Sequence, residues 1–323
     1  MIEESSRIIS RVIGHEDATP NPAKSIKNLR GSTYELNSAI ADLIDNSLDA
    51  QASEISVNID IRGTEISVID DGHGMDEQTH KESMKLGAET RIYSSSDLAK
   101  FGTGMKAASL SLGGQLTVVT KTADSRKISV RRLDEEHVLS TNDWKVATLV
   151  IDQEDISEKI TNYLIERGHG TAVVISKLDK AFGNGSNSDS DTILTHLEDL
   201  ETHLRLVFHR FIEGSFGIRR VSIRLNGNLL VPWDPFCLSP DLSLKARTEE
   251  FAAKQLDLGN GNQIWVRGFV LPNKKDFVNE RDHKLAAGPK GWNESQGFYI
   301  YRNGRLIRWE DGYELVRMTS TLS

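Results

Sequence analysis

Three carboxylates and an amide stand close together in the segment ADLIDNSLDA, residues 41–50. Asp42, Asn46 and Asp49 are spaced i, i+4, i+7, so a helix would place them on one face, with Asp45 beside them. Like charges on one helix face repel each other unless solvent or a cation offsets the repulsion. The segment is therefore either a solvated helix face or part of a site that holds a cation.

A second candidate site is the segment VIDDGHGMD, residues 68–76, which begins as a strand-like run. An ionised carboxylate such as Asp70 only accepts hydrogen bonds, so it can bind an exocyclic amino group such as that of adenine. Gly72 and Gly74 would let the backbone approach a flat ligand. Taken alone, the same pattern is also that of an ordinary Asx turn.

Two further segments carry glycine at the start of an expected element. Gly102 and Gly104 precede the small-residue helix MKAASLSLGG, with Lys106 in its first turn. Free N–H groups at a helix start bind phosphate, although the spacing of a P-loop is absent. Thr171 follows Gly170 in GHGTAVVI and carries a hydroxyl that can donate or accept. A loop that caps a packed helix and an ordinary strand start are the plainer interpretations.

The elements around these segments predict an α+β protein. Residues 34–50 have helical spacing, whereas EISVNID and TEISVID alternate with period two and form an expected hairpin. QLTVVTK, KISVRRL, KVATLVI and GTAVVISKL read as further strands. A Gly-, Ser-, Asn- and Asp-rich stretch at 180–192 is the expected domain boundary. The amphipathic helix LTHLEDLETHLRLVFHRFI and the strands VSIRLNG, QIWVRGFVL and GFYIYRNGRLI follow it.

Length and composition limit the classes of protein. A chain of 323 residues suggests about two domains, and 38% hydrophobic with 27% charged residues is typical of a globular protein. The formal charge of −8 argues against non-specific coating of nucleic acid, and no apolar run reaches the roughly 20 residues of a membrane span. The single cysteine, Cys237, excludes an internal disulfide. We expect a cytoplasmic protein, or a nuclear one in a eukaryote, without a membrane partner.

In the order of these motifs the chain resembles the GHKL ATPases, the superfamily of gyrase B, the ninety-kilodalton heat-shock chaperone, histidine kinases and MutL. The matching motifs are DLIDNSLDA (N box), DDGHGM (first glycine box), GTGMK (second glycine box) and GT at 170–171, and they cover roughly residues 30–178. RLNGNLLVPWDPF and GFYIYRNGRLI look like the second domain of MORC-type ATPases and their bacterial relatives.

The resemblance implies a Bergerat-type ATP-binding sandwich, in which helices cover one face of a mixed or antiparallel sheet, followed by a smaller α/β transducer-like domain. We expect an arm or strap at 1–30, the ATP-binding domain at 31–180 and an S5-like transducer domain at 193–323. The chain ends soon after the YRNGRLI strand, so we expect either a fragment of a longer protein or a shortened relative.

The resemblance also implies roles for single residues. Asn46 resembles the asparagine that ligates Mg²⁺ next to the triphosphate, and Asp70, assisted by Thr171, resembles the carboxylate that receives the adenine amino group. Asp42 stands where relatives carry their general base. The other expected ATP contacts are Asp49, Gly72, Gly74, Met75, Gly102, Thr103, Gly104, Met105, Lys106 and Lys290. Residues 87–101 would form a lid that closes over ATP.

Two departures from the family pattern bear on hydrolysis. Relatives that hydrolyse ATP carry glutamate where this chain has Asp42, and aspartate is one methylene shorter. Because misplacing a catalytic group by about 1 Å can cost about a hundredfold in rate, we expect slow turnover. The families also place a lysine late in the second domain on the γ-phosphate. Lys290 is a candidate for it here, and the late lysine itself is expected beyond the chain end.

The expected function is a magnesium-dependent ATPase switch: ATP orders the lid, two protomers dimerise through their N-terminal domains, and effector regions or DNA receive the signal. The alternative is an ATP-binding regulatory module with little or no hydrolysis. A histidine kinase would need a phosphoacceptor histidine on a dimerising helix, and the upstream His15 lies in no such pattern. A chaperone would need a client-binding region that these residues do not contain.

Overall fold

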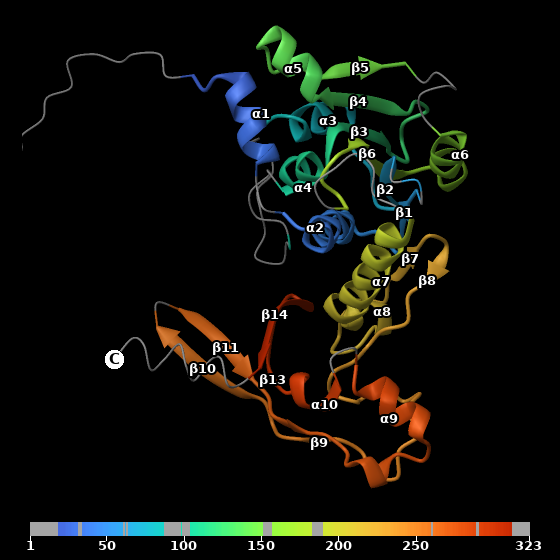
Figure 1. Ribbon diagram of the computed structural model, residues 1–323, viewed down its shortest axis with the longest axis vertical. Coiled ribbons are helices and arrows are strands. Elements are labelled where there is room, and N and C mark those ends of the chain that lie inside the picture. Colours follow the sequence, from blue (N-terminus) through green and yellow to red (C-terminus); the bar gives the residue numbers. More distant parts are fainter. Residues whose placement is uncertain are drawn as a thin grey trace, which may run out of the picture.

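An eight-stranded mixed sheet forms the centre of the larger, N-terminal unit of structure (Figure 1). The computed structural model describes residues 19–31, 34–60, 62, 64–86, 98, 104–150, 157–182, 190–259, 261–288 and 291–311. The strands lie in the order β5-β4-β3-β6-β2-β1-β7-β8. Their bounds are β1 Glu54–Ile59, β2 Glu65–Asp70, β3 Gly113–Lys121, β4 Ser129–Asp134, β5 Ala147–Leu149, β6 Gly170–Leu178, β7 Ser222–Leu225 and β8 Asn228–Leu229.

One parallel pair makes the sheet mixed. β1 and β2 form the expected antiparallel hairpin, and β2 pairs with β6 and β6 with β3, again antiparallel. β7 lies parallel to β1, with Ile55 opposite Ile223. The expected α+β class with a mixed sheet is confirmed. β7 and β8 come from the segment expected to begin the second domain, so this part of the chain completes the sheet of the first unit.

Most helices of the N-terminal unit cover one face of the sheet. The helices of the N-terminal unit are α1 Pro22–Arg30, α2 Leu36–Asp49, α3 Glu77–Ser83, α4 Gly104–Leu112, α5 Glu135–Thr141 and α6 Glu158–Arg167. α2 presents Ile40, Leu43 and Ile44, all fully or almost fully buried, to a core that includes Val68 and Ile175 of the sheet. α1 occupies part of the expected arm and contacts α4 and α5.

α6 lies on the opposite face of the sheet. Its Ile160 and Leu164 join a second apolar cluster with Ile69, Ala172 and Val174. These strand residues alternate along the chain with those of the main core, as the two faces of a strand require. The sheet is therefore an inner layer with helix on both sides, although the larger group of helices belongs to the α2 side.

The C-terminal unit consists of short hairpins attached through α7 Ser190–Val207 and α8 His209–Glu213. The expected single amphipathic helix is divided at Phe208, which is fully buried. The remaining elements are β9 Glu249–Glu250, β10 Lys254–Gly259, β11 Asn262–Val266, β12 Phe269–Val270, η1 Lys274–Asp276, α9 Glu280–Ala286, α10 Gly291–Glu294, β13 Gly297–Arg302 and β14 Arg305–Asp311. They pair as β10–β11, β12–β9 and β13–β14 (Figure 1).

Aromatic side chains hold this second unit to α8. Phe236 stacks on Phe269 with ring centroids 4.3 Å apart and contacts Tyr299 edge-on. The imidazole Nε2 of His209 lies 2.8 Å from the hydroxyl of Tyr301. Among the helices of the described residues, none is long and apolar enough to cross a membrane.

Candidate functional site

Asp70 is fixed at the end of β2, where the strand faces α2. The Ser47 hydroxyl donates to Oδ2 at 2.8 Å, and the Gly72 N–H donates to Oδ1 at 2.8 Å. Burial raises the pKa of Asp70 to about 6, and the hydrogen bonds from Ser47 and Gly72 oppose that rise. In the β2–β6 register Asp70 lies opposite Thr171, as the resemblance requires. The carboxylate is thus a buried acceptor of fixed orientation.

Gly72 and Gly74 are required by the protein's own backbone. A Cβ on Gly72 would lie 2.8 Å from both the Cβ and the carbonyl oxygen of Ala50. Gly74 has φ +71°, and its Cβ would meet the Lys121 carbonyl oxygen at 2.0 Å. The close approach that the sequence suggested for a ligand is therefore made in the structure to the end of α2 and to β3.

A threonine that the sequence did not single out fastens this corner. The Thr120 hydroxyl donates to the Gly170 carbonyl at 3.0 Å and lies 3.1 Å from the Thr171 hydroxyl. It also accepts the Met75 N–H at 2.9 Å, which ties the loop after β2 to β3 and β6. Met75 itself is half-buried against the main core. Thr120 is fully buried in a strand read as ordinary, so only the fold brings it to the site.

The acidic face of α2 divides into three environments. The Asn46 amide nitrogen donates to the Asp42 carbonyl at 2.9 Å, so the Oδ1 atom is directed to the other side of the amide group. Asp42 accepts the Tyr34 hydroxyl on Oδ2 at 2.8 Å. Asp49 accepts the backbone N–H of Leu98 at 2.9 Å and so contacts the segment expected to form the lid.

Asp45 is the buried member of the group and has a partner from the far end of the chain. Arg305 on β14 approaches it with Nε at 2.8 Å from Oδ1 and 2.6 Å from Oδ2, and reaches Asp42 with Nη2 at 3.6 Å from Oδ1. Burial raises the pKa of Asp45 to about 7, and the Arg305 charge opposes the rise. The sequence left open whether this helix face is solvated or forms part of a cation site, and a wholly solvated face does not describe α2.

α4 begins at Gly104 and packs against α2. An added Cβ on Gly104 would meet no heavy atom within 4 Å among the described residues, so none of them fills the space beside this glycine. Met105 is half-buried against the core. Lys106 is 1% exposed and its ammonium donates to the Ser83 carbonyl at 2.6 Å.

Burial lowers the pKa of Lys106 to about 8. A phosphate contact by Lys106 stays a prediction; its ammonium has three donors, of which one serves the Ser83 carbonyl. Three other predicted contacts, Gly102, Thr103 and Lys290, lie outside the described residues. The same holds for the expected lid at 87–101 apart from Leu98.

The donor set fits a metal that is shared with a polyphosphate. Within the described part of the chain, no group of three or more His, Cys, Asp or Glu side chains could hold a metal ion alone. Asn46 offers one amide oxygen, and Mg²⁺ commonly takes one or two protein oxygens together with phosphate oxygens and water. The Asn46 environment therefore suits magnesium carried by a nucleotide rather than a structural metal.

A comparison with protein families decides the class. The family model described as histidine kinase-, DNA gyrase B- and HSP90-like ATPase matches residues 34–171, the range that holds Asp42, Asn46, Asp70 and Thr171. Residues 34–171 thus carry the sequence pattern of the GHKL ATPase superfamily. The chain is 27% identical over 149 residues to the mouse protein ATPase MORC2A and 26% identical over 149 residues to human ATPase MORC2, and 42% of this chain is covered in each case.

The chain also matches the DNA mismatch repair protein MutL of Streptococcus equi subsp. equi, with 33% identity over 98 residues that cover 29% of this chain. These matches cover 14–15% of the curated relatives' own length. The expected superfamily is confirmed, and it supports ATP binding and ATPase chemistry as the general activity of this domain.

Proposed function

We propose that the chain binds Mg²⁺ and ATP at the site formed by α2, the end of β2 and the start of α4, and that it hydrolyses the ATP slowly. The observation that supports this most is the Ser47–Asp70 hydrogen bond. It fixes the adenine-type acceptor on β2 one residue away, along α2, from the metal-type oxygen of Asn46. A base-binding group and a phosphate-binding group thus share one helix.

Each site residue has a definite part in this proposal. Asp70 accepts the exocyclic amino group of adenine, with Thr171 beside it, and the backbone of Gly72, Gly74 and Met75 lines the base and sugar. Asn46 supplies the protein oxygen to magnesium, which neutralises charge on the phosphates. The N–H groups at Gly104 and Met105 bind phosphate oxygens at the helix start.

Asp42 is the proposed general base. Its carboxylate is partly exposed and lies one helical turn before Asn46, where an attacking water could reach it. Turnover is slow because aspartate reaches less far than glutamate. The second candidate function, an ATP-binding regulatory module with little or no hydrolysis, is favoured by the same short side chain.

We further propose a switch cycle. ATP favours the closed lid because the closed form contacts it more extensively, and differential affinity is what shifts such an equilibrium. Lid closure then promotes dimerisation through the N-terminal domains and signals to attached effector regions or to DNA. MORC2 and MutL are named as an ATPase and a DNA mismatch repair protein, and the partner in this chain is inferred from that likeness.

Isothermal titration of ATP with and without Mg²⁺ tests the binding site. Asp70→Asn should abolish measurable ATP binding. Asn46→Ala should remove the dependence of ATP binding on magnesium. The matched control is Asp71→Asn, because the Asp71 carboxylate is bound to Ser53 and Glu54 at the other side of the strand. Equal loss in both aspartate variants would contradict the assignment.

Phosphate release under single-turnover conditions separates the two candidate functions. Sedimentation with a non-hydrolysable ATP analogue and Mg²⁺ tests dimerisation, and addition of a DNA duplex tests that partner. A protein that binds ATP, dimerises and releases no phosphate would be the regulatory module.

A further inference from the structure

Two arginines flank the turn of the β13–β14 hairpin. Arg302 and Arg305 are direct partners in the antiparallel register. The two residues between them, Asn303 and Gly304, have φ +50° and +88°, the conformation of a tight two-residue turn. Like charges directly opposite each other destabilise a hairpin. The pair is therefore expected to have partners outside the hairpin.

Arg305 finds its partners on α2. Its side chain is 13% exposed, and the guanidinium joins Asp45 through Nε at 2.6 Å and Asp42 through Nη2 at 3.6 Å. The planar fork of arginine can serve two carboxylates at once, which the single ammonium of lysine does less well. The second unit of the structure thus supplies a cation to the face of α2 that carries the proposed base.

Arg302 reaches the expected lid. It donates a hydrogen bond to the carbonyl oxygen of Leu98, and the N–H of Leu98 donates to Asp49 on α2. The same hairpin therefore contacts both α2 and a residue of the predicted lid.

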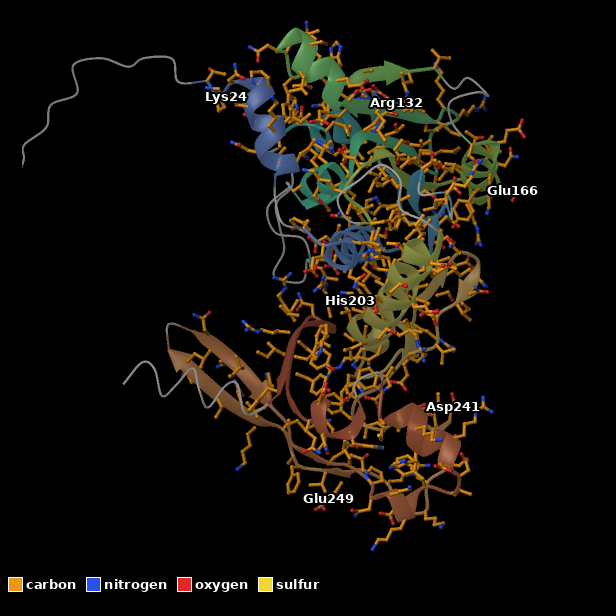
Figure 2. The ribbon with its side chains drawn as sticks, in the orientation of Figure 1. Lys24, Arg132, Glu166, His203, Asp241 and Glu249 are labelled. Carbon is orange, nitrogen blue, oxygen red and sulfur yellow. The ribbon has the colours of Figure 1, made fainter. Side chains whose placement is uncertain are left out.

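Packed elements hold the hairpin in this place. Trp309 of β14 lies against His203 of α7, the residue that Figure 2 labels, with ring centroids 5.8 Å apart. The Gly304 backbone is so near Ile218 that a Cβ would lie 2.7 Å from it. The ring of Phe208 lies 5.7 Å from the guanidinium carbon of Arg305. Arg305 is thus presented by rigid structure, as a precise contact requires.

We propose that Arg305 is a positioning residue for hydrolysis: with Tyr34 it orients the Asp42 carboxylate, so the second unit completes the ATPase site. Tyr34 engages one oxygen of Asp42 and Arg305 the other. Each carboxylate oxygen keeps a second lone pair, so the base can still accept a proton from water. This inference rests on the proposed function. It adds Arg305 as the residue through which ATP hydrolysis depends on the second unit.

The inference separates binding from turnover. Among the described residues, neither Asp70 nor Asn46 forms a hydrogen bond or ion pair with Arg305, so loss of the guanidinium should leave ATP affinity within about threefold of wild type. Loss of orientation at Asp42 should lower the single-turnover rate about ten- to a hundredfold, the range expected from a displacement near 1 Å.

Arg305→Gln is the test variant, Arg305→Lys the conservative one and Arg308→Gln the control, because Arg308 lies exposed on the same strand. The expected order of single-turnover rates is wild type and Arg308→Gln first, Arg305→Lys next and Arg305→Gln last. In an Asp42→Ala background, Arg305→Gln should change the residual rate less than twofold. If Arg305→Gln alone does not fold, the double variant with Asp45→Asn is measured instead, because it removes the buried Asp45 charge that has lost its partner.

A second readout needs no nucleotide. The melting-temperature shifts of Arg305→Gln and Asp42→Asn should be non-additive in the double variant, and additive shifts would overturn the inference. A wild-type rate in Arg305→Gln, or an equal loss with and without Asp42, would also overturn it. A wild type that binds ATP and releases no phosphate overturns the inference alone, whereas absence of ATP binding refutes the proposed function itself.

Discussion

Lowering the pH from 7 to 5 should weaken adenine nucleotide binding about tenfold through Asp70. Burial holds the pKa of this carboxyl near 6. The ionised carboxylate is the stronger acceptor for the adenine amino group, so in the limiting case the nucleotide binds only after the neutral form has released its proton. The apparent dissociation constant then grows as 1 + 10^(6−pH), which is about 1.1 at pH 7 and about 11 at pH 5 for a group that titrates near 6.

The assay is calorimetry of ADP with Mg²⁺ at several pH values, compared with the diphosphate of purine riboside. The second ligand has the same phosphates but no exocyclic amino group, so the ratio of the two affinities cancels phosphate titration. For wild type, the affinity for ADP divided by the affinity for the purine riboside diphosphate should fall about tenfold between pH 7 and pH 5. In Ser47→Ala the midpoint should move to higher pH, because the Ser47 hydrogen bond lowers the pKa of Asp70.

An affinity ratio that stays constant between pH 7 and pH 5 would refute the reasoning, since it would mean that Asp70 does not receive the amino group. Circular dichroism at both pH values is the control that the protein remains folded.

Three further predictions concern hydrolysis and stability. Asp42→Glu should raise the single-turnover phosphate release rate tenfold or more, because the added methylene moves the base about 1 Å towards the water; an unchanged rate would count against Asp42 as the limiting group. Burial lowers the pKa of His209 to about 3, so below pH 6.5 the folded state binds fewer protons than the unfolded state and stability is lost as the pH falls. In urea unfolding between pH 6 and pH 5, His209→Phe should therefore lack about 1.2 kcal/mol of the wild-type decline, because an unfolded-state histidine is not yet fully protonated at pH 6, and parallel declines would contradict this. Gly74→Ala should cost about 3 kcal/mol or more, because a left-handed φ and a collision with the Lys121 carbonyl add together; Gly104→Ala is the control and should unfold no more easily than wild type.

Local patterns carried most of what the sequence predicted. The helical spacing of 34–50 and the alternation of the two strands before Asp70 specify α2 and the β1–β2 hairpin, because each depends on residues a few positions apart. The same local patterns placed Asn46 and Asp70 in elements that meet. Which ligands Asn46 and Asp70 bind stays a prediction, because the contacts of these side chains within the protein do not identify a ligand.

Long-range contacts account for what the sequence did not indicate. Arg305 bonds Asp45 across 260 positions, and the YRNGRLI motif showed only a strand. Lys106 follows a glycine box in a pattern typical of phosphate contact, yet its helix turns it onto Ser83. Thr120 becomes part of the site because β3 pairs with β6. None of these partners can be read from spacing within one segment.

The parallel pairing of β7 with β1 has a consequence during synthesis of the protein. β1 leaves the ribosome roughly 160 residues before β7, and at about 5–20 residues per second its outer edge stays open for ~10–30 s. An open strand edge is a template for pairing with other chains. The nascent polypeptide should therefore depend on holding chaperones during that interval, and released chains that end before residue 222 should be more prone to aggregate than released chains that end after residue 225.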